Sequence, residues 1–253
     1  MPFAADAHSR PDYDYGVETW LADLDRHGIV YGVIAAASLF NDANAYTLAT
    51  LAAHPQRLRG TVITPPETSR QALGNMADHG VVGVRLTWRR VEELPDLDSE
   101  PYRGFLRRIA DCGMHVELLS RSVSLPHLLP ALDAAGVAVV VDHFGVPSRD
   151  PAERHAGTEA LCRAVDTGRV WVKLSAGFRM PFEIAAEVSS CLVASAGPER
   201  LLWGSDAPFV NHEAGTGFAD TLDLYRRLVP DPATRAAIDR TALALFFNQE
   251  NSR

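Results

Sequence analysis

The stretch VAVVVDHFG (Val137–Gly145) places five apolar residues directly before an aspartate and a histidine, with a glycine two positions further on. A short, unbroken apolar run rich in valine is typical of a parallel strand that is covered on both faces. The polar pair therefore stands where a buried strand ends. This arrangement indicates an α/β fold with polar groups gathered at one edge of the sheet.

Six further runs of this kind occur, separated by stretches of helical period. The expected strands are Ile29–Ala37, Leu58–Thr64, Val81–Thr87, Met114–Leu119, Val137–His143, Val170–Leu174 and Leu201–Ser205. Helices are expected near residues 17–27, 42–53, 68–78, 100–111, 124–134, 155–167 and 183–195, with one or two more between about 218 and 247. This alternation predicts a (β/α)8 TIM barrel, one strand short of the usual eight. A doubly wound open sheet is the rival, but no glycine-rich phosphate loop follows the first strand.

Composition narrows the class of protein. The 253 residues are 47% hydrophobic without a shift along the chain, so a single domain over residues 1–253 is expected. The net charge of −8 and the scattered basic residues argue against a nucleic-acid or membrane partner. No apolar run reaches the ~20 residues that cross a bilayer, and no signal peptide is recognisable, so a cytoplasmic protein is expected. Cys112, Cys162 and Cys191 lie far apart in sequence and are interpreted as buried free thiols.

Ionisable or hydroxyl side chains stand at the ends of five of the seven expected strands. They are Ser38, Arg85, Asp142, His143, Lys173 and Asp206, with Arg89, Arg90 and Arg179 in the loops just beyond. Catalytic groups of a barrel project from the carboxyl ends of its strands. Because unpaired buried charge is costly, convergence of these groups on one site is the simplest interpretation.

Asp206 and His143 are the candidate catalytic residues. Asp206 in LLWGSDAPF (Leu201–Phe209) suits a general base or a metal ligand, and its alternative is a helix cap or a turn. His143 suits a metal ligand or a group that polarises a carbonyl, and its alternative is a hydrogen-bonded core histidine. Of the other histidines, His115 begins a strand at the end away from the chemistry, and His212, in the loop after Asp206, is placed within reach of substrate.

Four arginines are candidates for holding an anionic substrate, because a guanidinium group binds a carboxylate with two hydrogen bonds. They are Arg85, Arg89, Arg90 and Arg179. Of the neighbours Arg89 and Arg90, one is expected in the site and one in solvent. Lys173 is a further candidate for binding substrate, and its alternative is a structural ion pair with a neighbouring carboxylate.

The chain resembles the amidohydrolase-related barrels, and within them the branch of the 2-pyrone-4,6-dicarboxylate lactonases. The resemblance spans nearly the whole chain and is carried by PFAAD (Pro2–Asp6), LRGTVITPP (Leu58–Pro66), GVRLTW (Gly83–Trp88), VVVDHFGVP (Val139–Pro147), VWVKLSAGFR (Val170–Arg179) and LLWGSDAPF. It implies hydrolysis of a small, carboxylated lactone or a related cyclic ester or amide. By this resemblance, Asp206 activates water and His143 sits against the carbonyl or a metal. Arg85 and Arg179, with Arg89 or Arg90, grip substrate carboxylates, and Ser38 adds a hydrogen bond.

The sequence departs from this family at two points. The family opens with a strand that carries a His-x-His pair, whereas here PFAAD already stands at the second residue, and DAH (Asp6–His8) follows no apolar run and is interpreted as a loop. The lactonases place a tyrosine at the end of their fifth strand, where this chain has Leu118 and Leu119. Only His143 and Asp206 remain as metal ligands, fewer than the usual three or four.

Three explanations of the missing first strand stay open. The protein starts upstream, a partner element replaces the strand, or the enzyme works without metal, which is the favoured reading. Zinc or another divalent metal is expected only if an upstream His-x-His strand exists. The open edge beside Ile29–Ala37 would favour a homodimer or filling by other segments. The alternative functions are a metal-dependent non-oxidative decarboxylase of the same superfamily, and a non-catalytic relative.

Overall fold

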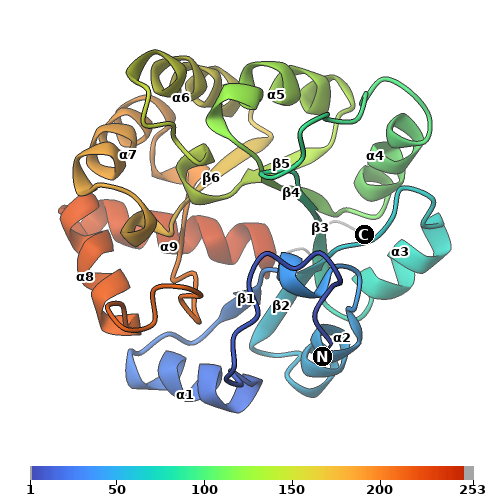
Figure 1. Ribbon diagram of the computed structural model, residues 1–253, viewed down its shortest axis with the longest axis horizontal. Helices are drawn as coiled ribbons and strands as arrows, with labels where there is room; N and C mark the ends of the chain where they lie inside the picture. The colour runs from blue at the N-terminus through green and yellow to red at the C-terminus, as the bar shows by residue number, and fades with distance from the viewer. Residues whose placement is uncertain (1, 248–253) are drawn as a thin grey trace.

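Seven parallel strands form one curled sheet, with helices around its outer face (Figure 1). The computed structural model describes residues 2–247. The strands follow one another in chain order: β1 (Gly32–Ile34), β2 (Leu58–Val62), β3 (Val81–Thr87), β4 (His115–Leu119), β5 (Ala138–Val141), β6 (Val170–Ser175) and β7 (Leu201–Gly204). The predicted α/β barrel architecture is therefore confirmed, as are the positions of all its expected strands.

The helices also lie where the sequence predicts them. They are α1 (Val17–Arg26), α2 (Ala45–Ala53), α3 (Arg70–Ala77), α4 (Tyr102–Asp111), α5 (Leu125–Ala134), α6 (Pro151–Val165), α7 (Phe182–Ala196), α8 (Phe218–Leu228) and α9 (Pro232–Phe246). Helix α6 begins four residues earlier than the predicted 155, because the Asp150 side chain accepts hydrogen bonds from the backbone N–H groups of Ala152 and Glu153. Among residues 2–247, no helix has both the length and the apolar character needed to cross a bilayer.

The sheet curls into a half-barrel that is open between its first and last strands. Within residues 2–247, β1 is paired with β2 and β7 with β6, and no pairing joins β1 to β7. The sequence-based count of seven strands is thus confirmed. Strand β1 is shorter than predicted: Val30 and Tyr31 are exposed and precede the three residues that pair with β2.

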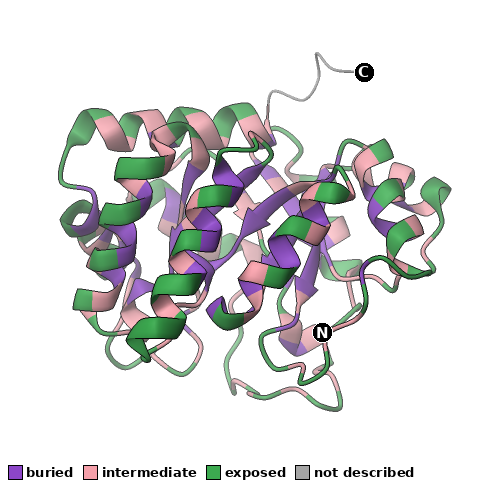
Figure 2. Ribbon diagram, turned by 90° about the horizontal axis from the view of Figure 1, so that it is seen from above, coloured by how far each residue is buried: buried purple, intermediate pink, exposed green. Residues whose placement is uncertain are grey.

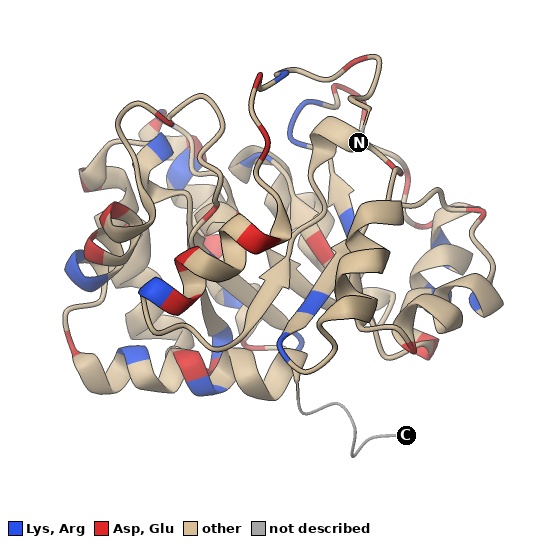
Figure 3. Cartoon of the chain, turned by 90° about the horizontal axis from the view of Figure 1, so that it is seen from below, with Lys and Arg blue, Asp and Glu red and all other residues tan. Residues whose placement is uncertain are grey.

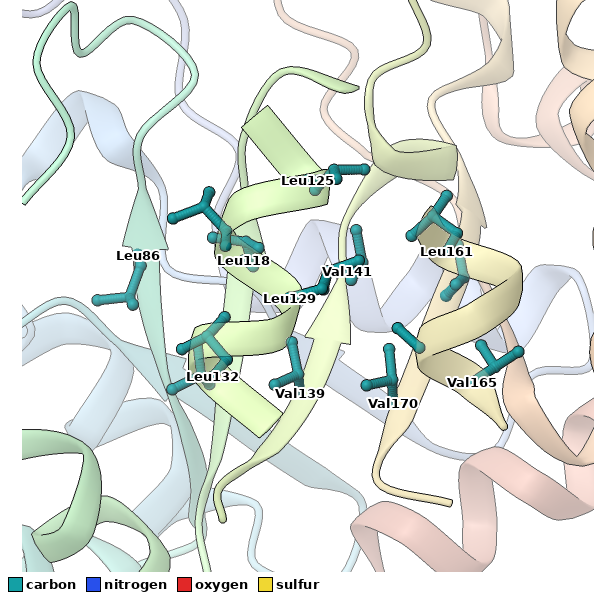
Figure 4. Packing of buried hydrophobic residues seen from close by; sticks show 14 of the residues in the cluster. Leu86, Leu118, Leu125, Leu129, Leu132, Val139, Val141, Leu161, Val165 and Val170 are labelled. Carbon is teal, nitrogen blue, oxygen red and sulfur yellow. The ribbon is translucent and has the colours of Figure 1, made fainter. Parts of the chain in front are cut away.

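The main core lies between the sheet and the surrounding helices, as the buried strands and the exposed outer helix faces show in Figure 2. In Figure 4, the leucines of α5 point towards the strand residues Leu118, Val139 and Val141. Leu125, Leu129 and Leu132 follow the spacing of one helix face, and all three are buried. Burying one such side chain contributes about 1.5–3 kcal/mol, so this layer supplies much of the stability that holds the strands in place.

Helix α9 closes one end of the half-barrel. Its Phe246 packs in a small apolar cluster with Val82, Val140 and Leu202, which come from three different strands. Figures 2 and 3 show α9 at one end of the strands and the start of the chain at the opposite end, where the strands finish. The carboxyl ends of the strands are therefore the end that remains for a site.

His115 lies beside this cluster, at the end away from the carboxyl edge as predicted. Its ring is 2% exposed, packs 5.6 Å from the Phe246 ring and lies so close to Gly83 that a Cβ there would come within 2.6 Å of Nε2. Neither ring nitrogen has a hydrogen-bond partner of normal geometry in the described residues. Burial, with a smaller effect of Lys173, lowers the pKa of His115 to about 3.

We expect His115→Leu to make the protein less sensitive to acid. The unfolded chain protonates His115 near its ordinary pKa of 6.5, whereas the folded protein does not until about pH 3, so folding stability falls as the pH decreases through this range. Between about pH 7 and pH 5 the wild type should lose up to about 2 kcal/mol more than the variant, since one pKa unit corresponds to about 1.4 kcal/mol. Urea unfolding at both pH values measures this difference. An equal loss in the two proteins would contradict the assignment.

Candidate active site

Four charged side chains fill the middle of the half-barrel. Arg85 of β3, Glu117 of β4, Lys173 of β6 and Asp142, which follows β5, are each at most 12% exposed. Arg85 donates to Asp142 Oδ2 through Nε at 3.0 Å and Nη2 at 2.8 Å, and its Nε lies 2.9 Å from Glu117 Oε1. Lys173 Nζ lies 2.5 Å from Glu117 Oε2 and 3.0 Å from Asp142 Oδ1. We call these four residues the ion network.

The ion network has two cations and two anions, and each carboxylate touches both cations. Burial opposes all four charges, but the carboxylates of Asp142 and Glu117 outweigh it for Arg85 and Lys173, whose pKa values are raised. Burial is likewise outweighed at Asp142, where Lys173 and Arg85 hold the pKa below its usual range. At Glu117, burial and the neighbouring Asp142 carboxylate outweigh the attraction of Lys173 and Arg85, so the pKa of Glu117 is raised.

These contacts engage Arg85 within the protein, and its expected grip on a substrate carboxylate stays a prediction. The resemblance implied that Arg85 grips a substrate carboxylate, but its guanidinium donates to Asp142 and, through Nη1, to the carbonyl of Ala36 at 2.7 Å. All three guanidinium nitrogens are thus used within the protein. Lys173 makes the structural ion pairs that were its alternative, with Glu117 and Asp142, and its expected contact with substrate stays a prediction.

His143 and Asp206 meet above the ion network, at the carboxyl ends of β5 and β7. His143 Nε2 lies 3.7 Å from Asp206 Oδ1, and their side chains are 13% and 21% exposed. On its other side, His143 Nδ1 is hydrogen-bonded to Ser175 Oγ at 2.7 Å. Burial lowers the pKa of His143 despite the opposing effects of Asp206 and Asp142. The imidazole is therefore neutral near neutral pH.

Arg179 binds the second oxygen of the Asp206 carboxylate. Its Nε donates to Asp206 Oδ2 at 2.6 Å, its Nη1 donates to the carbonyl of Val210 at 2.9 Å, and its guanidinium lies over the Phe178 ring. These contacts fix the guanidinium and orient the carboxylate. Arg179 thus lies in the site, and both of these hydrogen bonds are made to protein groups.

The backbone bends into the left-handed region after three adjacent strands. His143 after β5, Ala176 after β6 and Asp206 after β7 have φ angles of 52°, 57° and 60°. This conformation costs a residue other than glycine about 1–2 kcal/mol. Its recurrence where His143 and Asp206 are placed is typical of functional sites, where strain is tolerated to aim a side chain.

Further cations line the mouth of the half-barrel. Arg89 and Arg90 are exposed, and no hydrogen bond or ion pair of either is found within residues 2–247. Burial, then Arg90 and Arg179, lowers the pKa of Arg89. The pKa of His8 is also lowered, by burial and then by these arginines. Arg89, Arg90 and Arg179 therefore form one cationic rim, with the neutral imidazole of His8 beside it.

A cavity of about 1090 Å³ connects the rim with His143 and Asp206. Ser38, in the short helical turn after β1, and both Arg89 and Arg90 line it, which corrects the expectation that one of the two arginines faces away from the site. The cavity continues along the open side between β1 and β7, past Val33 and Leu202. It is large enough for a small organic substrate.

The start of the chain covers part of this mouth. Ala4 N–H donates to the carbonyl of Leu39, Ser9 donates to Asn211, and Tyr13 donates to Glu213, so residues 4–13 reach from the end of β1 to the loop after β7. The DAH segment is a loop, as predicted, yet His8 lines the cavity.

Three residues of this arrangement were missed by sequence reasoning. Glu117 interrupts the apolar strand HVELL, and this lone charge was the available signal. Ser175 and His8 gave none, because a serine after a strand and a histidine in a loop are common. His212 was considered within reach of substrate, but its ring packs against Phe178 and is not among the residues that line the cavity.

A divalent metal does not fit the side chains present. Within residues 2–247, no three His, Cys, Asp or Glu side chains gather closely enough to share an ion. His143 and Asp206 make only a pair, and the guanidinium of Arg179 stands against the Asp206 carboxylate where it would repel a cation.

A curled parallel sheet with its polar groups at the carboxyl edge defines a barrel of the amidohydrolase type. The amidohydrolase family model matches residues 2–247, and the chain belongs to this family.

Solved structures and a characterised relative agree with this assignment. A Pseudomonas putida protein inferred to be a 2-pyrone-4,6-dicarboxylic acid hydrolase is 34% identical, with a TM-score of 0.88 over 96% of this chain and 91% of that one. An Acinetobacter baumannii protein with the same inferred activity, solved with citric acid bound, is 28% identical, with a TM-score of 0.90 over 96% and 93%. A 4-sulfomuconolactone hydrolase of Rhizobium radiobacter is 26% identical over 89% of this chain and 78% of the relative.

We expect Lys173→Met to destabilise the protein by about 3–5 kcal/mol, because it leaves two buried carboxylates with one cation. The double variant Lys173→Met with Glu117→Gln restores the balance of charge and should recover part of this loss. Urea unfolding of the wild type, both single variants and the double variant gives the coupling between the two sites. If the double variant loses the sum of the single losses, the ion pair between Lys173 and Glu117 is not what holds this region together.

Proposed function

We propose that the protein hydrolyses a small lactone that carries an acidic group, with Asp206 as the general base. The observation that carries this proposal is the position of the Asp206 carboxylate: it lies in the mouth, 3.7 Å from His143 Nε2, and beneath a cationic rim. A 3.7 Å gap between the two groups leaves them free to bind a water molecule and a carbonyl oxygen on adjacent sides. The family and its lactone-hydrolysing relatives support the same reaction class.

His143 is suited to donate a hydrogen bond to the carbonyl. Because Nε2 faces the Asp206 carboxylate, the neutral ring is expected to carry its proton on Nε2, and the Ser175 hydroxyl then donates to Nδ1. The buried neighbours that keep this imidazole neutral thereby keep its Nε2–H available as a donor. Ser175 acts as the positioning residue that fixes the tautomer.

The reaction then needs only the side chains described. Asp206 accepts a proton as the water oxygen attacks the lactone carbonyl carbon, and the oxyanion that forms receives a hydrogen bond from His143 Nε2–H. The tetrahedral intermediate collapses with cleavage of the bond between the carbonyl carbon and the ring oxygen. The departing ring oxygen takes the proton back from Asp206, so that one water and one lactone give one hydroxy acid and the enzyme is restored.

The cationic rim indicates that the substrate is an anion. Arg89 and Arg90 line the cavity without a counter-ion among the described residues, in a chain whose net charge is −8. Cations held together in this way lose repulsion when an anion binds between them. A carboxylate or a sulfonate on the substrate fits this role, and Ser38 adds a hydroxyl on the same cavity wall.

Replacing Asp206 by Asn should remove the general base and lower kcat/KM by about 100-fold or more. The assay is turnover of a panel of five- and six-membered lactones bearing carboxylate or sulfonate groups, followed by proton release. Asp223→Asn, at an exposed ion pair on α8, is the matched control and should keep full activity. Activity of the Asp206 variant within a few-fold of wild type would refute the mechanism, and failure of the wild type on the whole panel would refute the substrate class.

Arg89→Gln and Arg90→Gln should raise KM for an anionic lactone by about tenfold, with kcat much less affected, because the rim contacts the substrate charge and not the bond that breaks. The effect should weaken in high salt and be absent for an uncharged lactone of the same ring size. Arg163→Gln, at an exposed pair on α6, serves as control. Equal effects on charged and uncharged lactones would show that these arginines do not recognise the charge of the substrate.

A further inference from the structure

Two cysteines that are far apart in sequence lie side by side between α6 and α7. Cys162 Sγ of α6 and Cys191 Sγ of α7 are 3.6 Å apart, and Figure 1 shows the two helices as neighbours. Ser195, one turn after Cys191, donates to the Cys191 carbonyl at 2.7 Å, and its Oγ lies 3.0 Å from Cys162 Sγ. Cys191 is exposed and Cys162 is half-buried, so the predicted buried thiols are not what the structure shows.

We propose that Cys162 and Cys191 are a disulfide-forming thiol pair that links α6 to α7 in the presence of a disulfide oxidant such as oxidised glutathione. The sulfur atoms already lie in contact, so only a small movement of each side chain is needed to reach bonding distance. Both residues lie in the later turns of their helices and neither lines the cavity. The pair is therefore independent of the proposed catalytic chemistry.

The exposure of the two thiols sets the order of steps. The accessible Cys191 loses its proton and attacks one sulfur of oxidised glutathione, which releases one glutathione thiolate and leaves a mixed disulfide on Cys191. The Cys162 thiolate then attacks Cys191 Sγ and releases the second glutathione. Two protein thiols are oxidised by two electrons, and one molecule of oxidised glutathione is reduced to two of glutathione.

The surroundings of Cys191 control the rate at which its thiol reacts. Burial, and then the contact with Cys162, raises the pKa of Cys191. Because the thiolate is the attacking form, bridging should be slow at neutral pH and accelerate in mildly alkaline solution. The bridge would close a loop over residues 163–190, which restricts the unfolded chain.

The test is to incubate the whole protein with oxidised glutathione at mildly alkaline pH and to record the intact mass, the free thiols and a non-reducing peptide map. We expect loss of two hydrogen atoms, a fall from three free thiols to one, a peptide that joins residues 162 and 191, and a melting temperature raised by roughly 5 °C that dithiothreitol reverses. A wild type that keeps its three thiols, or that retains glutathione on Cys191, overturns the proposal. An unchanged melting temperature in the bridged protein overturns the link between the helices.

Matched variants separate the two steps. Cys162→Ser should stop at a stable glutathione adduct on Cys191, because no second thiol lies within reach to displace it. Cys112→Ser should bridge as the wild type does, since Cys112 lies on another helix end, with its thiol near the Arg70 carbonyl. Bridging through Cys112, or release of glutathione from the Cys162→Ser protein, would contradict the assignment.

Discussion

The ion pairs of Arg85 with Asp142 and Glu117 are the interaction on which the rest of the half-barrel depends. Within residues 2–247, no backbone pairing joins β1 to β7, so hydrogen bonds between strands do not by themselves close the sheet. Arg85 supplies a link across the interior: from β3 it reaches Asp142 after β5 and the Ala36 carbonyl after β1. Helix α9 supplies the other link, at the opposite end of the strands. Together, Arg85 and α9 hold the sheet in its curled shape.

The same network places the proposed catalytic groups. Asp142 directly precedes His143. The contacts of Arg85 and Lys173 with Asp142 therefore also fix the backbone position from which the His143 side chain extends. A buried set of four charges is not a stronger core than four apolar side chains would be, because removing charges from water offsets most of their attraction. What the charges provide here is a defined geometry: each carboxylate fits its two cations in one arrangement, and His143 and Ser175 lie directly above it.

The fold could be predicted from the sequence because its signals are local. Apolar runs such as Val137–Val141 and the glycines after α3, α4 and α5 each report on their own segment, and Gly80, Gly113 and Gly136 do adopt the positive φ that ends a helix. Partners could not be predicted in this way. Arg85 lies opposite Glu117 only because of the register between β3 and β4, and Asp142 is 57 residues away in sequence. The ion pairs of Arg85 could not be foreseen for that reason, and Glu117 was overlooked.

The charge distribution supports the proposed preference of the site for an anionic substrate. The chain as a whole is negative and repels anions at long range, yet Arg89, Arg90, Arg179 and His8 are gathered at one mouth. Their repulsion is visible in the lowered pKa values of Arg89 and His8, where the arginines add to the effect of burial. This repulsion is a free energy that the folded protein carries while the mouth is empty and loses when an anion enters. A neutral lactone of the same shape would leave it in place, so the rim favours a charged substrate even before any contact with the bond that breaks.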